Sequence, residues 1–132
     1  MACILVVDDD QDILKTFKRD LTHQGHQVIC AATGYEALHS MRFRPALVLL
    51  DIALPGMDGI ELCRQLRSDP LSAATPILFV TVSNDIESKT AAFDAGADDY
   101  LVKPFDLQEL NLRVQVLLAR DRFHSTYESN PD

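Results

Sequence analysis

Near its start the chain reads CILVVDDD over residues 3–10, an apolar run of five residues followed at once by three aspartates. The same pattern returns at residues 47–51, LVLLD. Unbroken runs of branched apolar residues are typical of strands that are buried on both faces of a parallel sheet. Ligands of such sheets bind beyond the carboxyl ends of the strands, where these aspartates fall. The two stretches therefore predict a parallel α/β sheet with an acidic site at one edge.

Outward from these stretches, short β-branched runs alternate with segments of helical period, which is the pattern of βαβ units. The first helical segment places Ile13, Phe17 and Leu21 at four-residue spacing and ends near Gly25, a residue suited to a left-handed helix end. Crossovers between parallel strands are right-handed, so helices cover both faces of the sheet. We expect strands at residues 3–7, 27–32, 47–50, 76–82 and 100–102. The predicted fold is α/β, a three-layer doubly wound sheet of five parallel strands.

Local signals also mark the ends of the later helices. We expect the fourth helix to begin at Ser83 or Asn84, because Asn84 and Glu87 have capping-box spacing. It should stop near Gly96, and Asp106 should cap the fifth helix.

Length and charge limit the class of protein. A chain of 132 residues with 47% hydrophobic content has enough apolar material for one domain. We expect that domain over residues 1–122 and a frayed polar tail, or the start of a linker, over residues 123–132. A net charge of −8 argues against a nucleic-acid partner, so a DNA role would need a further domain.

Cysteine usage and the absence of long apolar runs point to the cytoplasm. Cys3, Cys30 and Cys63 are odd in number and form no C-x-x-C pair, which favours buried, reduced thiols. No apolar run approaches the roughly 20 residues of a membrane span, and the chain does not begin with a signal-peptide pattern.

The strand-end aspartates predict a cation site. Asp8, Asp9 and Asp51 would share one crevice, where each pair of charges about 4 Å apart repels by about 4 kcal/mol at an effective dielectric of 20. Oxygen ligands and room for water favour Mg²⁺ over Ca²⁺, which requires more ligands. A lone aspartate after a strand can instead cap a helix, and Asp10 or Asp12 could have only that role.

Together these motifs resemble the receiver domains of bacterial response regulators over nearly the whole chain. Residues 5–10 are similar to the acidic-pair strand of that family, and residues 49–59 to its phosphoacceptor strand and loop. Residues 80–81 (VT) match the hydroxyl position, and residues 95–105 (AGADDYLVKPF) match the aromatic-switch strand with its lysine-proline turn. The resemblance implies the flavodoxin-like strand order 2-1-3-4-5.

The resemblance also implies a phosphoacceptor site that binds Mg²⁺. Asp51 would take a phosphoryl group from a phosphohistidine on a sensor histidine kinase or a phosphotransfer protein. Asp9 and Asp51 would ligate Mg²⁺ directly, Asp8 mainly through water, and the main-chain carbonyl of Ala53 would complete the protein ligands. The chain would then be a phosphorelay switch, and its only reactions would be self-phosphorylation and autodephosphorylation.

Three further residues would convert this chemistry into a signal. Lys103 would neutralise charge on the transferring group, and Thr81 would donate a hydrogen bond to a phosphoryl oxygen. Movement of Thr81 would let Tyr100 turn inward and change the surface formed by the fourth helix, fifth strand and fifth helix. The bond before Pro104 is expected to be cis.

Two positions depart from the commonest family pattern. Val82 stands where alanine or glycine is usual, and its bulk could narrow access to Asp51. Ala53 lacks the polar side chain that many relatives place there. Both departures bear on the rates of phosphorylation and hydrolysis.

Three alternative interpretations stay open at this point. Asp8 and Asp10 also present the D-x-D pair of haloacid-dehalogenase phosphatases, although Asp12 stands where that motif has threonine or valine. An interaction-only pseudo-receiver would keep the fold without phosphorylation. The chain could also be a module of a longer regulator or a hybrid kinase.

The fifth helix carries two apolar faces. One face should pack on the sheet. The other, which we name the α-helical stripe, should serve a partner chain in a homodimer or a downstream output domain. The first face contains Leu107, Leu110, Val114, Leu117 and Leu118; the stripe contains Leu112, Val116, Ala119 and Phe123.

Overall fold

The computed structural model describes the backbone of residues 2–129 and the side chains of residues 2–120. The strands are β1 (Cys3–Val7), β2 (Gln27–Ala31), β3 (Leu47–Leu50), β4 (Ile77–Thr81) and β5 (Asp99–Val102). The helices are α1 (Gln11–His23), α2 (Gly34–Ser40), the 3₁₀ turn η1 (Met41–Phe43), α3 (Gly59–Ser68), α4 (Ile86–Asp94) and α5 (Leu107–Ser129).

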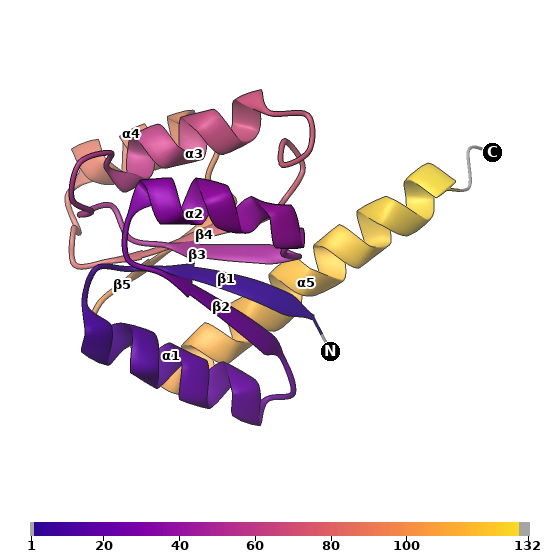
Figure 1. Ribbon diagram of the computed structural model, residues 1–132, viewed down its shortest axis with the longest axis horizontal. Helices are drawn as coiled ribbons and strands as arrows, with labels where there is room; N and C mark the ends of the chain where they lie inside the picture. The colour runs from indigo at the N-terminus through magenta and orange to yellow at the C-terminus, as the bar shows by residue number, and fades with distance from the viewer. Residues whose placement is uncertain (1, 130–132) are drawn as a thin grey trace.

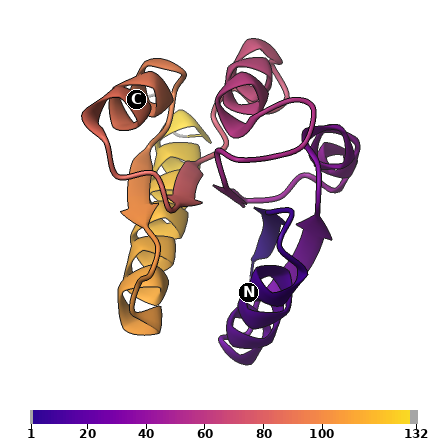
Figure 2. The same cartoon turned by 90° about the vertical axis from the view of Figure 1, so that its left-hand side faces the viewer.

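The five strands form one parallel sheet in the order β2-β1-β3-β4-β5, which confirms the predicted fold and topology. Helices α2, α3 and α4 cover one face, and α1 and α5 cover the other (Figures 1 and 2). The chain therefore has three layers, with the carboxyl ends of all five strands at the same edge.

Each face of the sheet has its own hydrophobic core. The core beneath α1 and α5 includes Phe17, which is 2% exposed and stacks on Phe105 with ring centroids 5.7 Å apart. The core beneath α2, α3 and α4 includes Phe79, which is fully buried. Burial of one such side chain stabilises the fold by roughly 1.5–3 kcal/mol. Leu107, which we expected in the α5 core, is 42% exposed because it lies at the first turn of the helix.

Side chains and glycines end the helices largely as expected. Asp10 caps α1, since its carboxylate accepts from the backbone N–H of Asp12 at 2.9 Å. Asp106 likewise accepts from a first-turn N–H of α5, at 2.8 Å. Gly25 and Gly96 follow α1 and α4 with φ of +95° and +113°, a left-handed conformation that glycine adopts without steric cost.

The start of α4 differs from the prediction. The helix begins at Ile86, and its cap is Asp85 in place of Ser83 or Asn84. Asp85 accepts from both the backbone N–H and the hydroxyl of Ser88, each at 3.0 Å. These two hydrogen bonds hold the cap at Asp85.

The end of α5 also differs, because the backbone stays helical to Ser129 where we expected a frayed tail after Arg122. Figure 1 shows the last turns of α5 running beyond the sheet.

In the part of the chain that the structure describes, no helix has the length and apolar character of a membrane span. Smaller differences occur at strand ends, where residues 32, 76 and 82 lie just outside β2 and β4.

Candidate functional site

Strand register brings two of the predicted aspartates together. Val7 of β1 pairs with Leu50 of β3, so the residues that follow, Asp8 and Asp51, leave neighbouring strands at the same level. The Asp51 N–H donates to the Val7 carbonyl at 3.0 Å and fixes this alignment. Asp8 is 2% exposed and Asp51 is 7% exposed, so both carboxylates lie in a crevice largely shielded from water.

Lys103 joins the two carboxylates. Its Nζ lies 2.6 Å from Asp8 Oδ2 and 3.0 Å from Asp51 Oδ2. The Lys103 N–H donates to the Thr81 carbonyl at 2.8 Å, which fixes the backbone of Lys103. The bond to Pro104 is cis, as predicted. One ammonium thus bridges the ends of β1 and β3 from the end of β5.

Burial and pairing shift the ionisation of these groups. Burial raises the pKa of the Asp8 carboxyl, and the hydrogen bonds from Lys103 and the Asp10 N–H only partly offset this. For Lys103, burial lowers the pKa, but hydrogen bonds to Asp8 and Asp51 outweigh it and raise the pKa above its ordinary value. The ammonium is therefore charged at neutral pH. Ionisation of Asp8 costs more than it would in water, so additional positive charge nearby would favour it.

The ligand chemistry of the crevice fits Mg²⁺, although Asp9 is not part of the cluster. Asp9 is exposed, and within the described residues no three acidic, histidine or cysteine side chains converge closely enough to hold a metal. Mg²⁺ is commonly bound by one or two carboxylates with several waters, which Asp8 and Asp51 can supply. The loop after β3 folds back over Asp51, since the Ala53 N–H donates to Asp51 Oδ1 at 3.3 Å.

The predicted hydroxyl and aromatic residues meet through Ser83, which we expected only as a possible start of the fourth helix. Thr81, fully buried at the end of β4, accepts from the Ser83 N–H at 3.4 Å. The Tyr100 hydroxyl donates to the Ser83 carbonyl at 2.8 Å, and the ring is 9% exposed. Burial, followed by the carboxylates of Asp85 and Asp51, raises the pKa of Tyr100. Tyr100 therefore already occupies the inward position that we expected after phosphorylation.

Gly59 is a second residue of the site without a predicted role. A Cβ at this position would collide with the main-chain oxygen of Asp51. The Gly59 N–H donates to the Ile52 carbonyl at 2.8 Å, so the start of α3 lies directly against the acceptor strand. Val82, whose bulk we expected to affect access, is 68% exposed at the same edge of the sheet.

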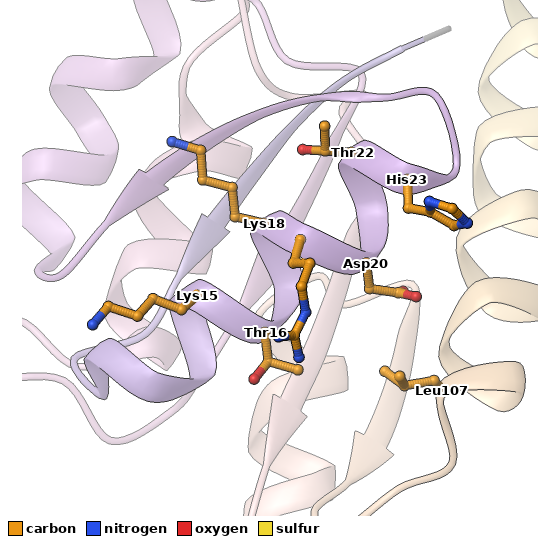
Figure 3. Close-up of a pocket in the computed structure, with 8 residues that line it drawn as sticks. Lys15, Thr16, Lys18, Asp20, Thr22, His23 and Leu107 are labelled. Carbon is orange, nitrogen blue, oxygen red and sulfur yellow. The ribbon is translucent and has the colours of Figure 1, made fainter.

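A separate hollow of about 770 Å³ lies along α1 (Figure 3). Its lining includes three cations, Lys15, Lys18 and Arg19, and reaches Leu107 at the start of α5. None of the crevice residues is among those that line it. It is therefore a surface distinct from the bridged carboxylates.

The α-helical stripe is exposed where the structure describes it. Leu112 and Val116 are 61% and 51% exposed, and Ala119 is also exposed. The side chain of Phe123 lies outside the described residues. The other predicted face packs inward, apart from Leu107, through Leu110, Val114, Leu117 and Leu118.

Comparison with known proteins identifies the family. Residues 4–115 match the family model of the response regulator receiver domain. The chain is 44% identical to the response regulator MprA of Mycobacterium leprae (strain TN) over 129 residues, which cover 96% of the chain and 55% of that relative. It is 47% identical to MprA of Mycobacterium sp. (strain KMS) over 120 residues, 89% of the chain and 50% of the relative.

Solved structures agree with this assignment. A receiver domain protein of Methanospirillum hungatei JF-1 is 32% identical with a TM-score of 0.88, over 94% of this chain and 98% of that one. The beryllofluoride-activated N-terminal receiver domain of Klebsiella pneumoniae RstA is 32% identical with a TM-score of 0.82, over 88% and 97%.

The chain belongs to the response regulator receiver domains of two-component signal transduction. Its relatives are regulators, and this family membership replaces the phosphatase interpretation. The chain spans about half the length of the curated relatives that it matches.

Proposed function

We propose that this receiver domain takes a phosphoryl group on Asp51, in a reaction that depends on Mg²⁺. The observation that carries the proposal is the ammonium of Lys103, which lies within hydrogen-bond distance of Asp8 and Asp51 at the carboxyl edge of the sheet. The donor is a phosphohistidine on a sensor histidine kinase or a phosphotransfer protein, the partner that membership of a two-component family implies.

In the proposed reaction, a carboxylate oxygen of Asp51 attacks the phosphorus of the phosphohistidine, and the phosphorus–nitrogen bond breaks as the imidazole leaves. Lys103 then pairs with an oxygen of the transferred group, and the Thr81 hydroxyl donates to another. Asp8, Asp9, Asp51 and the Ala53 carbonyl would hold Mg²⁺. When bound, the metal offsets the negative charge on the phosphoryl oxygens, which is most of what a protein contributes to phosphoryl transfer.

The output would travel through Ser83. Thr81 and Tyr100 both hydrogen-bond the main chain of this residue, one at its N–H and the other at its carbonyl. A Thr81 hydroxyl that turns toward a phosphoryl group gives up its bond from Ser83, which changes the segment leading into α4. The surface of α4, β5 and α5 is therefore the proposed signalling surface, and the chain acts on no external substrate.

Two further observations support this assignment. The RstA receiver domain, which is 32% identical, is described as activated by beryllofluoride, a mimic of the phosphoryl group. All three cysteines of the chain are free thiols, which is typical of a reducing compartment and supports a cytoplasmic location. The expectation that all three are buried is wrong, because only Cys63 is buried, Cys3 is half-buried and Cys30 is exposed.

The test is intact mass spectrometry after incubation with acetyl phosphate. The wild type should gain one phosphoryl group in Mg²⁺ and none when a chelator is present, and Asp51→Asn should gain none. A phosphorylated Asp51→Asn protein would overturn the acceptor assignment. A wild type that stays unmodified would favour the second candidate, a pseudo-receiver that signals by interaction alone.

A further inference from the structure

A cavity of about 380 Å³ lies at the opposite edge of the sheet from Asp51. It opens between the end of α2 and the segment that joins α3 to β4, and its lining includes Met41, Pro45 and Leu66. Pro45 lies before β3 and Asp51 follows it. The four residues of β3, which span about 13 Å, therefore lie between this cavity and the carboxylate crevice. We name it the α2–α3 cavity.

The α2–α3 cavity combines an apolar floor with an apolar rim. Leu66, at 2% exposure, belongs to the hydrophobic core, and Met41 packs against that core. Leu71, which also lines the cavity, is 81% exposed, and nearby Phe43 is 52% exposed. Large apolar side chains beside a concave surface are typical of binding sites, and the volume falls within the usual range for them.

Two arginines give this cavity a positive side. Arg42 and Arg44 both line it, and in the described part of the chain neither forms an ion pair with a carboxylate. Residues 37–50 contain no Asp or Glu, although the chain carries 20 acidic against 12 basic residues. The guanidinium of Arg42 lies 4.2 Å from the centre of the Phe43 ring and donates to a main-chain carbonyl. One carboxylate, that of Asp69, also lines the cavity.

The backbone of Arg44 adds an independent observation. Its φ is +51°, and among the described residues it is the one non-glycine residue with positive φ. The same left-handed position would be less strained with glycine or asparagine. Non-glycine residues in this conformation cluster at functional sites, and here the same residue also ends η1. Here the strain places an arginine at the mouth of the α2–α3 cavity.

We propose that the α2–α3 cavity binds an acidic segment of a partner protein. The segment inserts one aliphatic or aromatic side chain between Met41 and Leu71 and pairs a carboxylate with Arg42 and Arg44. Charge complementarity selects this occupant, because two arginines without a carboxylate partner among the described residues, on a chain that is acidic as a whole, attract an anionic segment. The site is independent of phosphorylation and goes beyond the function proposed above.

The test uses ¹⁵N-labelled protein and the blocked peptide acetyl-EDLFDE-amide. Titration to millimolar peptide should give saturable shifts of backbone amides over residues 41–45 and 66–75. A peptide with Ala for Leu and Phe, and another with Asn and Gln for the acids, should each bind at least about tenfold more weakly. Shifts that are equal for all three peptides would overturn the proposal.

Charge-reversal variants test whether the peptide binds at this cavity or at other basic residues of the chain. Arg42→Glu with Arg44→Glu should weaken binding about tenfold or more, as expected for the loss of a charge-assisted pair. The matched control, Lys18→Glu with Arg19→Glu on α1, should bind as the wild type does. Leu71→Asp provides a second variant that spares the core, since this side chain is 81% exposed. Unchanged binding by the Arg42/Arg44 variant, or shifts confined to α1, would also overturn the proposal.

Discussion

The Tyr100 hydroxyl donates a hydrogen bond of 2.8 Å to the main-chain carbonyl of Ser83. The two residues belong to β5 and to the segment before α4, so the bond joins two parts of the proposed signalling surface. The Tyr100 ring also lies against Phe79 and Phe93, with ring centroids 6.2 and 6.3 Å apart. Tyr100 is thus held by two aromatic contacts as well as by its hydroxyl.

This environment predicts that the phenol of Tyr100 loses its proton at a higher pH than it would in the unfolded chain. Burial raises the pKa of its phenol above 10.0, so the folded chain keeps this proton longer than the unfolded chain does. The associated stability is fully present below pH 10.0 and is lost as pH rises through the folded-state pKa. Tyrosinate absorbance should show a late-titrating phase in the wild type that Tyr100→Phe removes. Tyr35→Phe, which removes a side chain that is 65% exposed, should leave the late phase intact.

Mg²⁺ should stabilise the fold, because the buried carboxylates of the crevice favour a bound cation. Mass action gives about 2.7 kcal/mol when the ion is present at about 100 times its Kd. The raised pKa of Asp8 means that ionising this group costs stability as pH rises above 3.8, so the gain from Mg²⁺ should be larger at pH 7 than at pH 4. Thermal melts measure this shift.

Substitutions of single aspartates test which residues bind Mg²⁺. Asp8→Asn and Asp9→Ala should each remove most of the Mg²⁺-dependent shift in melting temperature. An Asp9→Ala protein that responds like the wild type would show that exposed Asp9 is not a ligand. A wild type whose melting temperature is unmoved at millimolar Mg²⁺ would contradict the proposed metal site.

Removal of the Lys103 ammonium should destabilise the fold. In Lys103→Met, the carboxylates of Asp8 and Asp51 stay buried without a counter-charge, which should lower the free energy of unfolding by about 3 kcal/mol at pH 7 in chelator. Added Mg²⁺ should restore more stability to this variant than to the wild type. Denaturant unfolding measures both effects, with the exposed Lys15→Met as control. Equal midpoints for Lys103→Met and the control would show that the bridge contributes nothing.

Arg67 should stabilise the fold outside the crevice. Its guanidinium donates to the carbonyls of Thr75 at 2.6 Å and Gly96 at 2.9 Å, and pairs with Asp98 at 2.8 Å. Arg67→Ala should cost about 3 kcal/mol, because it removes the donor to the Thr75 and Gly96 carbonyls and the ion pair with Asp98, which keeps its bonds from the Ile77 N–H and Arg120. Arg64→Ala, one turn earlier and largely exposed, should change the free energy of unfolding by less than about 0.5 kcal/mol.

The α-helical stripe predicts that α5 binds a second copy of the chain. The double change Leu112→Ser and Val116→Ser removes two side chains that are 61% and 51% exposed, so the fold should be retained. Sedimentation with beryllofluoride should show dimers of the wild type and monomers of the double variant. A wild type that is monomeric in both states would leave the stripe without a role in self-association.

The sequence predicted the sheet because its strands are unambiguous. Residues 3–7 and 47–50 are apolar throughout, and five βαβ-type alternations fix the topology once the family resemblance supplies the strand order. The α4 cap was mispredicted, because Asn84 and Asp85 are adjacent and only the bonds to Ser88 distinguish them. The continuation of α5 was missed since a polar sequence gives no apolar period to follow.

The sequence predicted the pairing that strand register fixes, but it did not predict the contacts that pass through the main chain. Asp8 and Asp51 meet because β1 and β3 end together, which strand positions alone imply. Asp9, the next residue along the chain, is exposed, and its role as a ligand stays a prediction. Ser83 took part through its main chain, and a main-chain partner carries no signal in residue type.

The position of β3 between the two sites determines which surfaces of this small domain can bind other proteins at the same time. The strand runs from just beyond the α2–α3 cavity to just before Asp51, so its two ends face opposite poles of the molecule. A phosphodonor at one pole and an acidic segment at the other would not collide. The domain could therefore stay tethered to a scaffold while it exchanges phosphoryl groups, and its place in the cell could be set separately from its state of modification.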